Sequence, residues 1–138
     1  MRYNNATTPD PRRQYQNAVN RATGREFEAL IDRTLSDYAR RRIASIDKTP
    51  EPMQPTKDLG GGRFVAYYAK KAQVDYKGCI RGGRMIAFDA KHTFTGRVER
   101  TRITEGQAEY LDDYAELGAL CFVVVGFDMR RFFRVPWE

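Results

Sequence analysis

The sequence has little of the two side chains that most often bind transition metals. Histidine occurs once, at His92, and cysteine twice, at Cys79 and Cys121, without a CxxC pair. These counts exclude zinc sites built from histidine and cysteine, Ser-His-Asp triads and HNH-type nucleases. A catalytic metal would therefore need oxygen ligands, which favours Mg²⁺, with Mn²⁺ as a substitute. Both cysteines stand in apolar stretches and are predicted to be reduced and buried.

Long apolar runs are also absent. The longest, at residues 119–127, is far shorter than the roughly 20 residues that cross a bilayer as a helix. The N-terminal residues are polar and basic, so no signal peptide is expected. We therefore expect a cytoplasmic protein with no membrane contact.

Lysine is scarce relative to arginine, which supplies 18 of the 24 basic residues. The net charge is +6 and the sequence pI is about 9.5, so a polyanionic partner is expected. The guanidinium fork matches phosphate oxygens, which favours nucleic acid over a membrane surface. A GC-rich genome or a warm habitat would produce the same arginine bias, so the charge alone favours nucleic acid only modestly.

The N-terminal third of the chain is predicted to hold one helix. Residues 1–20 are polar, basic and interrupted by proline, which predicts a flexible arm that is either disordered or follows a DNA backbone. Thr23 and Glu26 have the spacing of a capping box, and apolar residues at helical spacing then predict a helix to about Arg42. The arginines at 40–42 are interpreted first as a helix end and second as a DNA patch.

The remainder is predicted to consist mostly of strands. Prolines and a triple glycine predict a long exposed loop at residues 46–62. Alternating or continuous apolar residues predict strands at 63–69, 74–80, 85–91, 119–127 and 130–137, and a helix from Thr104 to Leu117 that ends at Gly118. The order αβββαββ describes a mixed α/β fold, with one domain over residues 21–138.

Asp75 and Asp89 form the most informative pair in the sequence, because they lie at equal distances from Gly82. A hairpin with an odd-numbered loop at Gly82 would place the two carboxylates opposite each other on one face, and a three-residue loop with a left-handed glycine is a common solution. A two-residue turn at Gly82 and Gly83 would place them on opposite faces. Lys91 lies on the same face of its strand as Asp89.

Two carboxylates that converge across a strand pair can hold a hard divalent cation. Such a cation polarises a phosphate and activates water, and a neighbouring lysine can orient that water. A bare Asp-x-Lys pattern is more often an ordinary ion pair on an exposed strand. The partner Asp75 and the apolar flanks at Val74, Ile86 and Phe88 bring the functional interpretation level with the ordinary one.

The motifs Val74-Asp75-Tyr76-x-Gly78 and Phe88-Asp89-Ala90-Lys91-x-Thr93 resemble the active-site hairpin of the PD-(D/E)xK nucleases, and of the RecU family in particular. Other matches follow in family order over residues 20–128: Gly24-x-x-Phe27-Glu28, Lys48-Thr49-Pro50, Gln107, and Gly118-x-x-Cys121-Phe122. The resemblance implies a mixed sheet flanked by helices. It also implies an Mg²⁺-dependent endonuclease that resolves Holliday junctions as a homodimer bound to branched DNA.

The resemblance also assigns roles. It gives metal binding to Asp75, Asp89, the Ala90 carbonyl and Glu28, water activation to Lys91, and support of the site to Gln107. The chain departs from the family pattern in having Asp89 where glutamate is usual and Gly106 where histidine is usual. It also lacks the proline before Asp75, its hairpin turn is one residue longer, and the family's stalk is shortened to residues 54–73. These departures bear on metal geometry and junction selectivity.

Each supporting residue has an ordinary alternative role. Glu28 lies at the flank of the helical apolar stripe, where solvated acids are common, and Gln107 completes a capping box with Thr104. His92 should point away from the metal face and is interpreted as a surface or phosphate-contact residue. Contacts with nucleic acid are predicted for Arg25, Thr93, Arg97, Arg100 and Arg102, although a solvated basic loop also explains the last three.

Two other functions stay open from the sequence. One is a different nuclease of the same superfamily, acting in repair or as a restriction-like enzyme. The other is a DNA-binding protein on the same fold whose catalysis has degenerated. The intact Asp75, Asp89 and Lys91 favour a nuclease.

Overall fold

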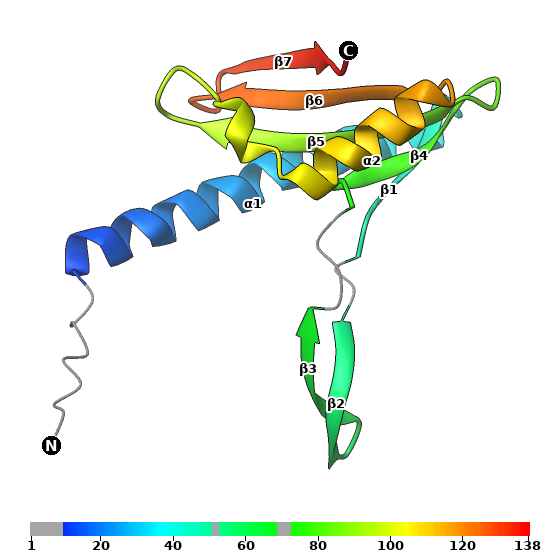
Figure 1. Cartoon of the computed structure of the whole chain (residues 1–138). Helices are drawn as coiled ribbons and strands as arrows, with labels where there is room; N and C mark the ends of the chain where they lie inside the picture. Colours follow the sequence, from blue (N-terminus) through cyan, green and yellow to red (C-terminus); the bar gives the residue numbers. More distant parts are fainter. Residues whose placement is uncertain (1–9, 51–52, 69–72) are drawn as a thin grey trace, which may run out of the picture.

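The computed structural model describes residues 10–50, 53–68 and 73–138 of the chain (Figure 1). Its elements are α1 (Pro11–Arg40), β1 (Ala44–Lys48), β2 (Met53–Gly60), β3 (Arg63–Tyr68), β4 (Tyr76–Ile80), β5 (Met85–Thr93), the short 3-10 helix η1 (Arg100–Arg102), α2 (Glu105–Glu116), β6 (Leu120–Phe127) and β7 (Arg131–Pro136). The predicted strands and the second helix are present. Two strands, β1 and β2, occupy much of the predicted loop at residues 46–62, so that prediction is wrong.

Five strands form one mixed sheet in the order β1-β4-β5-β6-β7. Only β5 and β6 pair in parallel, because α2 connects them as a crossover, and the other neighbours are antiparallel. The helices lie on opposite faces of this sheet, while β2 and β3 form a separate hairpin that projects away from it (Figure 1). The sheet therefore has two helix-covered faces and two edge strands, β1 and β7.

Helix α1 begins earlier than the sequence predicts. Its N-cap is Asp10, whose side chain accepts a hydrogen bond from the Arg12 amide at 2.9 Å, and Pro11 occupies the first turn. Thr23 is inside the helix and its hydroxyl donates to the Val19 carbonyl, so the predicted capping box with Glu26 is wrong. Residues 11–20 of the predicted arm are thus helical, and residues 1–9 lie outside the described residues.

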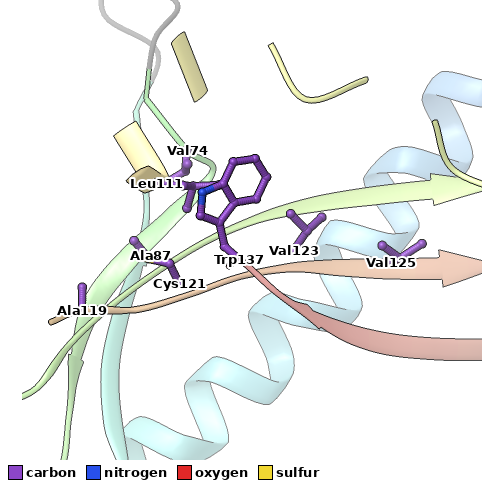
Figure 2. Packing of buried hydrophobic residues seen from close by; sticks show 8 residues of the cluster. All are labelled: Val74, Ala87, Leu111, Ala119, Cys121, Val123, Val125 and Trp137. Atoms are coloured by element: carbon purple, nitrogen blue, oxygen red, sulfur yellow. The ribbon is translucent and has the colours of Figure 1, made fainter. Parts of the chain in front are cut away.

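The hydrophobic core consists of two layers, one on each face of the sheet. Under α2 it contains Val74, Ala87, Leu111, Ala119, Cys121, Val123, Val125 and Trp137 (Figure 2). Under α1 it contains Phe27, Ile31, Tyr76, Ile86, Phe88 and Phe122. Because β5 and β6 contribute to both layers, they are buried on both faces, as the continuous apolar run of β6 predicts.

Cys121 is buried as predicted, but Cys79 on β4 is exposed, so its predicted burial is wrong. Alternation along β4 turns Cys79 away from the α1 layer, to which Tyr76 and the partly buried Ile80 belong. No helix in the described part of the chain is long and apolar enough to cross a membrane.

Candidate active site

The hairpin between β4 and β5 has the register that the candidate site requires. Tyr76 pairs with Phe88 and Cys79 with Met85, so Asp75 and Asp89 continue the same register at the open end. The amide of Ile80 donates to the Arg84 carbonyl at 2.9 Å, which closes a three-residue loop, and Gly82 and Gly83 have φ values of 96° and 88°. The predicted three-residue loop with a left-handed glycine is therefore confirmed, and the two-residue turn is excluded.

The two strands separate at Asp75, and the two carboxylates fill the gap. The Asp75 amide donates to Oδ1 of Asp89 at 3.2 Å, and the Ala90 amide donates to Oδ2 of Asp75 at 3.0 Å. Each carboxylate thus accepts one hydrogen bond from a backbone amide on the facing segment of chain. Both carboxylates converge at the opening between β4 and β5, as the sequence predicts.

Asp89 is completely buried and has a charged partner on its own strand. Its Oδ2 lies 2.6 Å from Nζ of Lys91, although the angle does not make a hydrogen bond, and the Lys91 side chain is 16% exposed. On the α2 side, Nε2 of Gln107 donates to Oδ1 of Asp89 at 3.3 Å. The structure therefore brings Asp75, Asp89, Lys91 and Gln107 together.

Gln107 is held by a capping box at the start of α2. Its amide donates to the Thr104 hydroxyl at 3.2 Å, and its Oε1 accepts from the Thr104 amide at 3.1 Å. The same side chain therefore caps the helix with its oxygen and contacts Asp89 with its nitrogen. Both roles that the sequence allowed for Gln107 are compatible in this geometry.

The environment of Asp75 disfavours its ionised form. Burial, followed by the hydrogen bond and charge of Asp89, raises the pKa of Asp75 to about 7, against the opposing effects of the Ala90 amide and Lys91. A bound cation would reduce the repulsion between the carboxylates of the half-buried Asp75 and the fully buried Asp89.

Glu28 lies on the wall of the same cleft but contacts a different residue. One carboxylate oxygen pairs with Nζ of Lys48 on β1. The pKa of Lys48 is raised, chiefly by this hydrogen bond. Among the described residues, no three Asp, Glu, His or Cys side chains converge as metal ligands. The role of Glu28 in the metal shell stays a prediction.

A cleft of about 630 Å³ opens beside these residues. Its lining comes from α1, from the residue before β4, from the end of β5 with the two residues after it, and from η1: Gln16, Asn20, Thr23, Gly24, Phe27, Glu28, Asp75, Ala90, Lys91, His92, Thr93, Phe94, Thr95 and Arg102. Asp75 and Lys91 therefore face a space that is open to a large ligand.

Of the predicted nucleic-acid contacts, Thr93 and Arg102 line the cleft, and Nη1 of Arg102 donates to the His92 carbonyl at 2.8 Å. Arg97 pairs with Glu99 at 2.7 Å, and the Arg100 guanidinium lies 4.5 Å from the centroid of the Trp137 ring. Arg25 is exposed on α1 but is not part of the cleft lining. The five predicted contacts are therefore spread over more than one surface.

His92 has a structural contact that the sequence did not indicate. Its Nε2 accepts a hydrogen bond from the Met129 amide at 2.9 Å, and its ring packs against Phe27 and Phe94. Burial lowers its pKa, which favours the neutral ring that this acceptor role requires. His92 is therefore a partly buried residue with a structural contact that also lines the cleft, and its contact with phosphate stays a prediction.

Lys48 is the main residue at the site that sequence reasoning missed. It was noted only as part of the Lys48-Thr49-Pro50 motif, because its strand β1 fell within a predicted loop. A periodic signal for β1 is weak: only Ala44 and Ile46 face inward in five residues. Lys48 pairs with Tyr76, the residue after Asp75. Its position therefore depends on pairing between strand residues that lie 28 positions apart in the sequence.

Comparison with known proteins gives a consistent result. The family model described as recombination protein U matches residues 22–138. The Holliday junction resolvase RecU of Streptococcus sanguinis is 31% identical over 114 residues, which cover 78% of this chain and 56% of that protein. The resolvase of the same name from Streptococcus pyogenes serotype M1 is 31% identical over 125 residues, which cover 86% of this chain and 62% of that protein. The chain thus spans little more than half the length of these relatives.

A solved structure shows a similar fold. It is that of Hjc, a Holliday junction resolvase from Archaeoglobus fulgidus, with a TM-score of 0.51 and 14% identity, covering 83% of this chain and 73% of that chain. This likeness confirms the predicted PD-(D/E)xK fold class, a mixed sheet flanked by helices. Over the residues that the structure describes, the element order differs from the predicted one in two additional strands before β3, namely β1 and β2, and in the short 3-10 helix η1.

Proposed function

We propose that this chain, which belongs to the RecU family, is a metal-dependent endonuclease. It would resolve four-way DNA junctions by phosphodiester hydrolysis. The observation that carries this proposal is the convergence of Asp75, Asp89 and Lys91 at the opening between β4 and β5, beside a cleft with basic residues. The chain spans 56% to 62% of the length of the relatives named above. Junction resolution by this chain is therefore part of the proposal.

The residues at the strand opening fit a hard divalent cation. Asp75 and Asp89 supply carboxylate oxygens, and the Ala90 carbonyl supplies a third oxygen of the kind that Mg²⁺ and Mn²⁺ prefer. Oδ2 of Asp89 is buried and accepts no hydrogen bond among the described residues, although Nζ of Lys91 lies 2.6 Å away, so this oxygen keeps lone pairs that a metal ion could use. When bound, the ion would polarise the scissile phosphate and lower the pKa of a water molecule.

The side chains around the ion would have separate roles in catalysis. Lys91, which faces the cleft from β5, would orient the attacking water and neutralise charge on the phosphate. Gln107 would hold the Asp89 carboxylate at a fixed orientation from α2. Glu28, paired with Lys48, would accept hydrogen bonds from metal-bound water rather than contact the ion directly.

Resolution of a junction requires two related cuts. A homodimer with C₂ symmetry is the simplest assembly that offers two equivalent sites to two strands of like polarity. We propose this assembly, with branched DNA as the partner and with Arg25, Thr93, Arg97, Arg100 and Arg102 as contacts to its backbone. The net charge of +6 supports a polyanionic substrate.

A second candidate function is junction binding without cleavage. It is favoured by the ion pair between Glu28 and Lys48, which leaves two carboxylates rather than three at the strand opening. Under this alternative the protein would bind DNA tightly and leave it intact in both Mg²⁺ and Mn²⁺.

The test compares cutting of a synthetic four-way junction with cutting of matched linear and flapped duplexes in Mg²⁺. Wild type should make paired symmetric nicks across the junction, and Asp75→Asn should make none. Equal cutting of the linear duplex would support nuclease activity but contradict a preference for junctions. Tight binding without any cutting in either metal would support the second candidate.

A further inference from the structure

Five arginines gather at the end of the sheet away from the candidate site. They are Arg40, Arg41, Arg42, Arg81 and Arg84, called here the arginine patch, and all five are exposed. The turn between β4 and β5 carries two of them, Arg81 and Arg84, whose side chains contact the residues that follow α1 and α2. We propose that this patch binds the phosphate backbone of duplex DNA about half a helical turn from the scissile phosphate, an inference that rests on the proposed nuclease function.

The two turn arginines are held in fixed orientations. Nε of Arg81 donates to the Arg42 carbonyl at 3.1 Å, and Nε of Arg84 donates to the Gly118 carbonyl at 2.9 Å. A guanidinium has five N–H donors, so anchoring through Nε leaves the two terminal nitrogens for another partner. That remaining fork matches the geometry of a phosphate.

Neighbouring negative charge does not account for the whole patch. The two helix ends together carry roughly one unit of negative charge, and Asp37 pairs with both Arg40 and Arg41. In the described part of the chain, Arg42, Arg81 and Arg84 form no ion pair, even though α2 ends close to Arg84 with Glu116. Capping of helix ends therefore explains the positions of Arg81 and Arg84 but leaves their terminal nitrogens, and Arg42, without an acidic partner.

The distance from the patch to the site fits one duplex. Five residues of chain separate Asp75 from Ile80 along β4, which corresponds to about 17 Å at the usual rise of a strand. The helical repeat of B-DNA is about 34–36 Å. A duplex laid along β4 with one phosphate at the strand opening would thus present backbone to the patch about half a repeat away.

The experiment measures how binding of a labelled four-way junction depends on salt, in EDTA so that no cutting occurs. Each phosphate contact contributes about 0.9 to the slope of log K against log salt. Arg42→Asn and Arg84→Gln should each lower the slope by about one, and the double variant by about two. Asparagine is chosen at position 42 because φ there is 57°, a conformation that asparagine tolerates.

Arg33→Gln is the matched control, because Arg33 is an exposed arginine on α1 outside the patch. Its slope should equal that of wild type. Arg84→Lys keeps the charge, so a normal slope for Arg84→Lys with a reduced one for Arg84→Gln would assign the effect to phosphate contact rather than to the anchor on Gly118. Thermal unfolding of each variant identifies any loss of fold.

The outcomes separate this inference from the proposed function. If wild type cuts the junction but the patch variants keep the wild-type slope, the patch proposal is overturned and the nuclease stands. If Arg33→Gln lowers the slope as much as the patch variants do, the effect is one of net charge and the patch proposal is also overturned. If wild type neither cuts nor binds the junction, the proposed function itself is wrong.

Discussion

Asp75 and Asp89 each accept a backbone hydrogen bond from the strand of the other, at 3.0 Å and 3.2 Å. The same two carboxylates that are proposed to bind metal thus complete the strand pairing where β4 and β5 separate. Substitutions at the two positions should therefore differ in their effect on stability as well as reduce activity.

Asp89→Asn should destabilise the metal-free protein by about 1–3 kcal/mol, because the partly buried ammonium of Lys91 would lose its carboxylate partner. Asp75→Asn should be neutral or stabilising at pH 8, because it removes a carboxylate whose ionisation Asp89 opposes. Urea unfolding of both variants in EDTA measures the difference. Equal destabilisation by the two substitutions would contradict this account of the pair.

The stability of the metal-free protein should fall as pH rises from about 4 to about 7. The pKa of Asp75 is about 7 in the folded chain and 3.8 ordinarily, so in this range the unfolded chain releases a proton that the folded chain retains. The stabilisation is fully present below pH 4 and is lost by the time Asp75 ionises in the folded state. Unfolding in urea across this range should show a slope of about one proton, which Asp75→Asn should abolish. Saturating Mn²⁺ should lower the pKa of Asp75 in the folded chain and thereby reduce or remove the decline.

Gln107 and Thr104 allow helix capping to be separated from support of the site. Thr104→Ala removes the hydroxyl that accepts the Gln107 amide and should cost about 1 kcal/mol of stability without changing metal affinity. Gln107→Leu keeps that backbone hydrogen bond but removes the two side-chain ones, from the Thr104 amide to Oε1 and from Nε2 to Asp89, and should weaken Mn²⁺ binding about 10-fold or more. Calorimetric titration with Mn²⁺ measures the affinity. Equal affinities in the two variants would restrict Gln107 to helix capping.

Gly78 should be intolerant of any side chain. A Cβ at this position would overlap the carbonyl of Ser45 on the neighbouring strand β1. Gly78→Ala should therefore displace β1 and destabilise the chain by about 1–3 kcal/mol, and should also move Lys48 away from Glu28. Gly24→Ala is a suitable control, since nothing lies within 4 Å of a Cβ there. A Gly78→Ala variant as stable as wild type would show that β1 can shift freely.

Local rules predicted the parts of the structure that depend on nearby residues. The register of Asp75 and Asp89 followed from their equal spacing about Gly82, and the start and end of α2 followed from Thr104, Gln107 and Gly118. In each case the deciding interactions join residues in one hairpin or at one helix end. These were also the rules that located the candidate site.

The parts that were missed depend on contacts that no local pattern encodes. The spacing of Thr23 and Glu26 matches a capping box, but α1 begins one residue after its N-cap Asp10 and continues through Thr23. Strand β2 contains Pro55, which is tolerated because the register shifts there. The contact of Lys48 with Glu28 joins residues 20 positions apart and needs the packing of β1 beside α1.

The hairpin of β2 and β3 stands apart from both core layers, and every residue of β2 is exposed. A two-stranded hairpin alone is marginally stable in water, so its amide protons should exchange with solvent through local opening. The amides of β5 and β6, buried on both faces, should exchange only through global unfolding. The protein thus consists of a slowly exchanging platform that fixes the carboxylates and a rapidly exchanging hairpin, whose sequence can vary without affecting the platform.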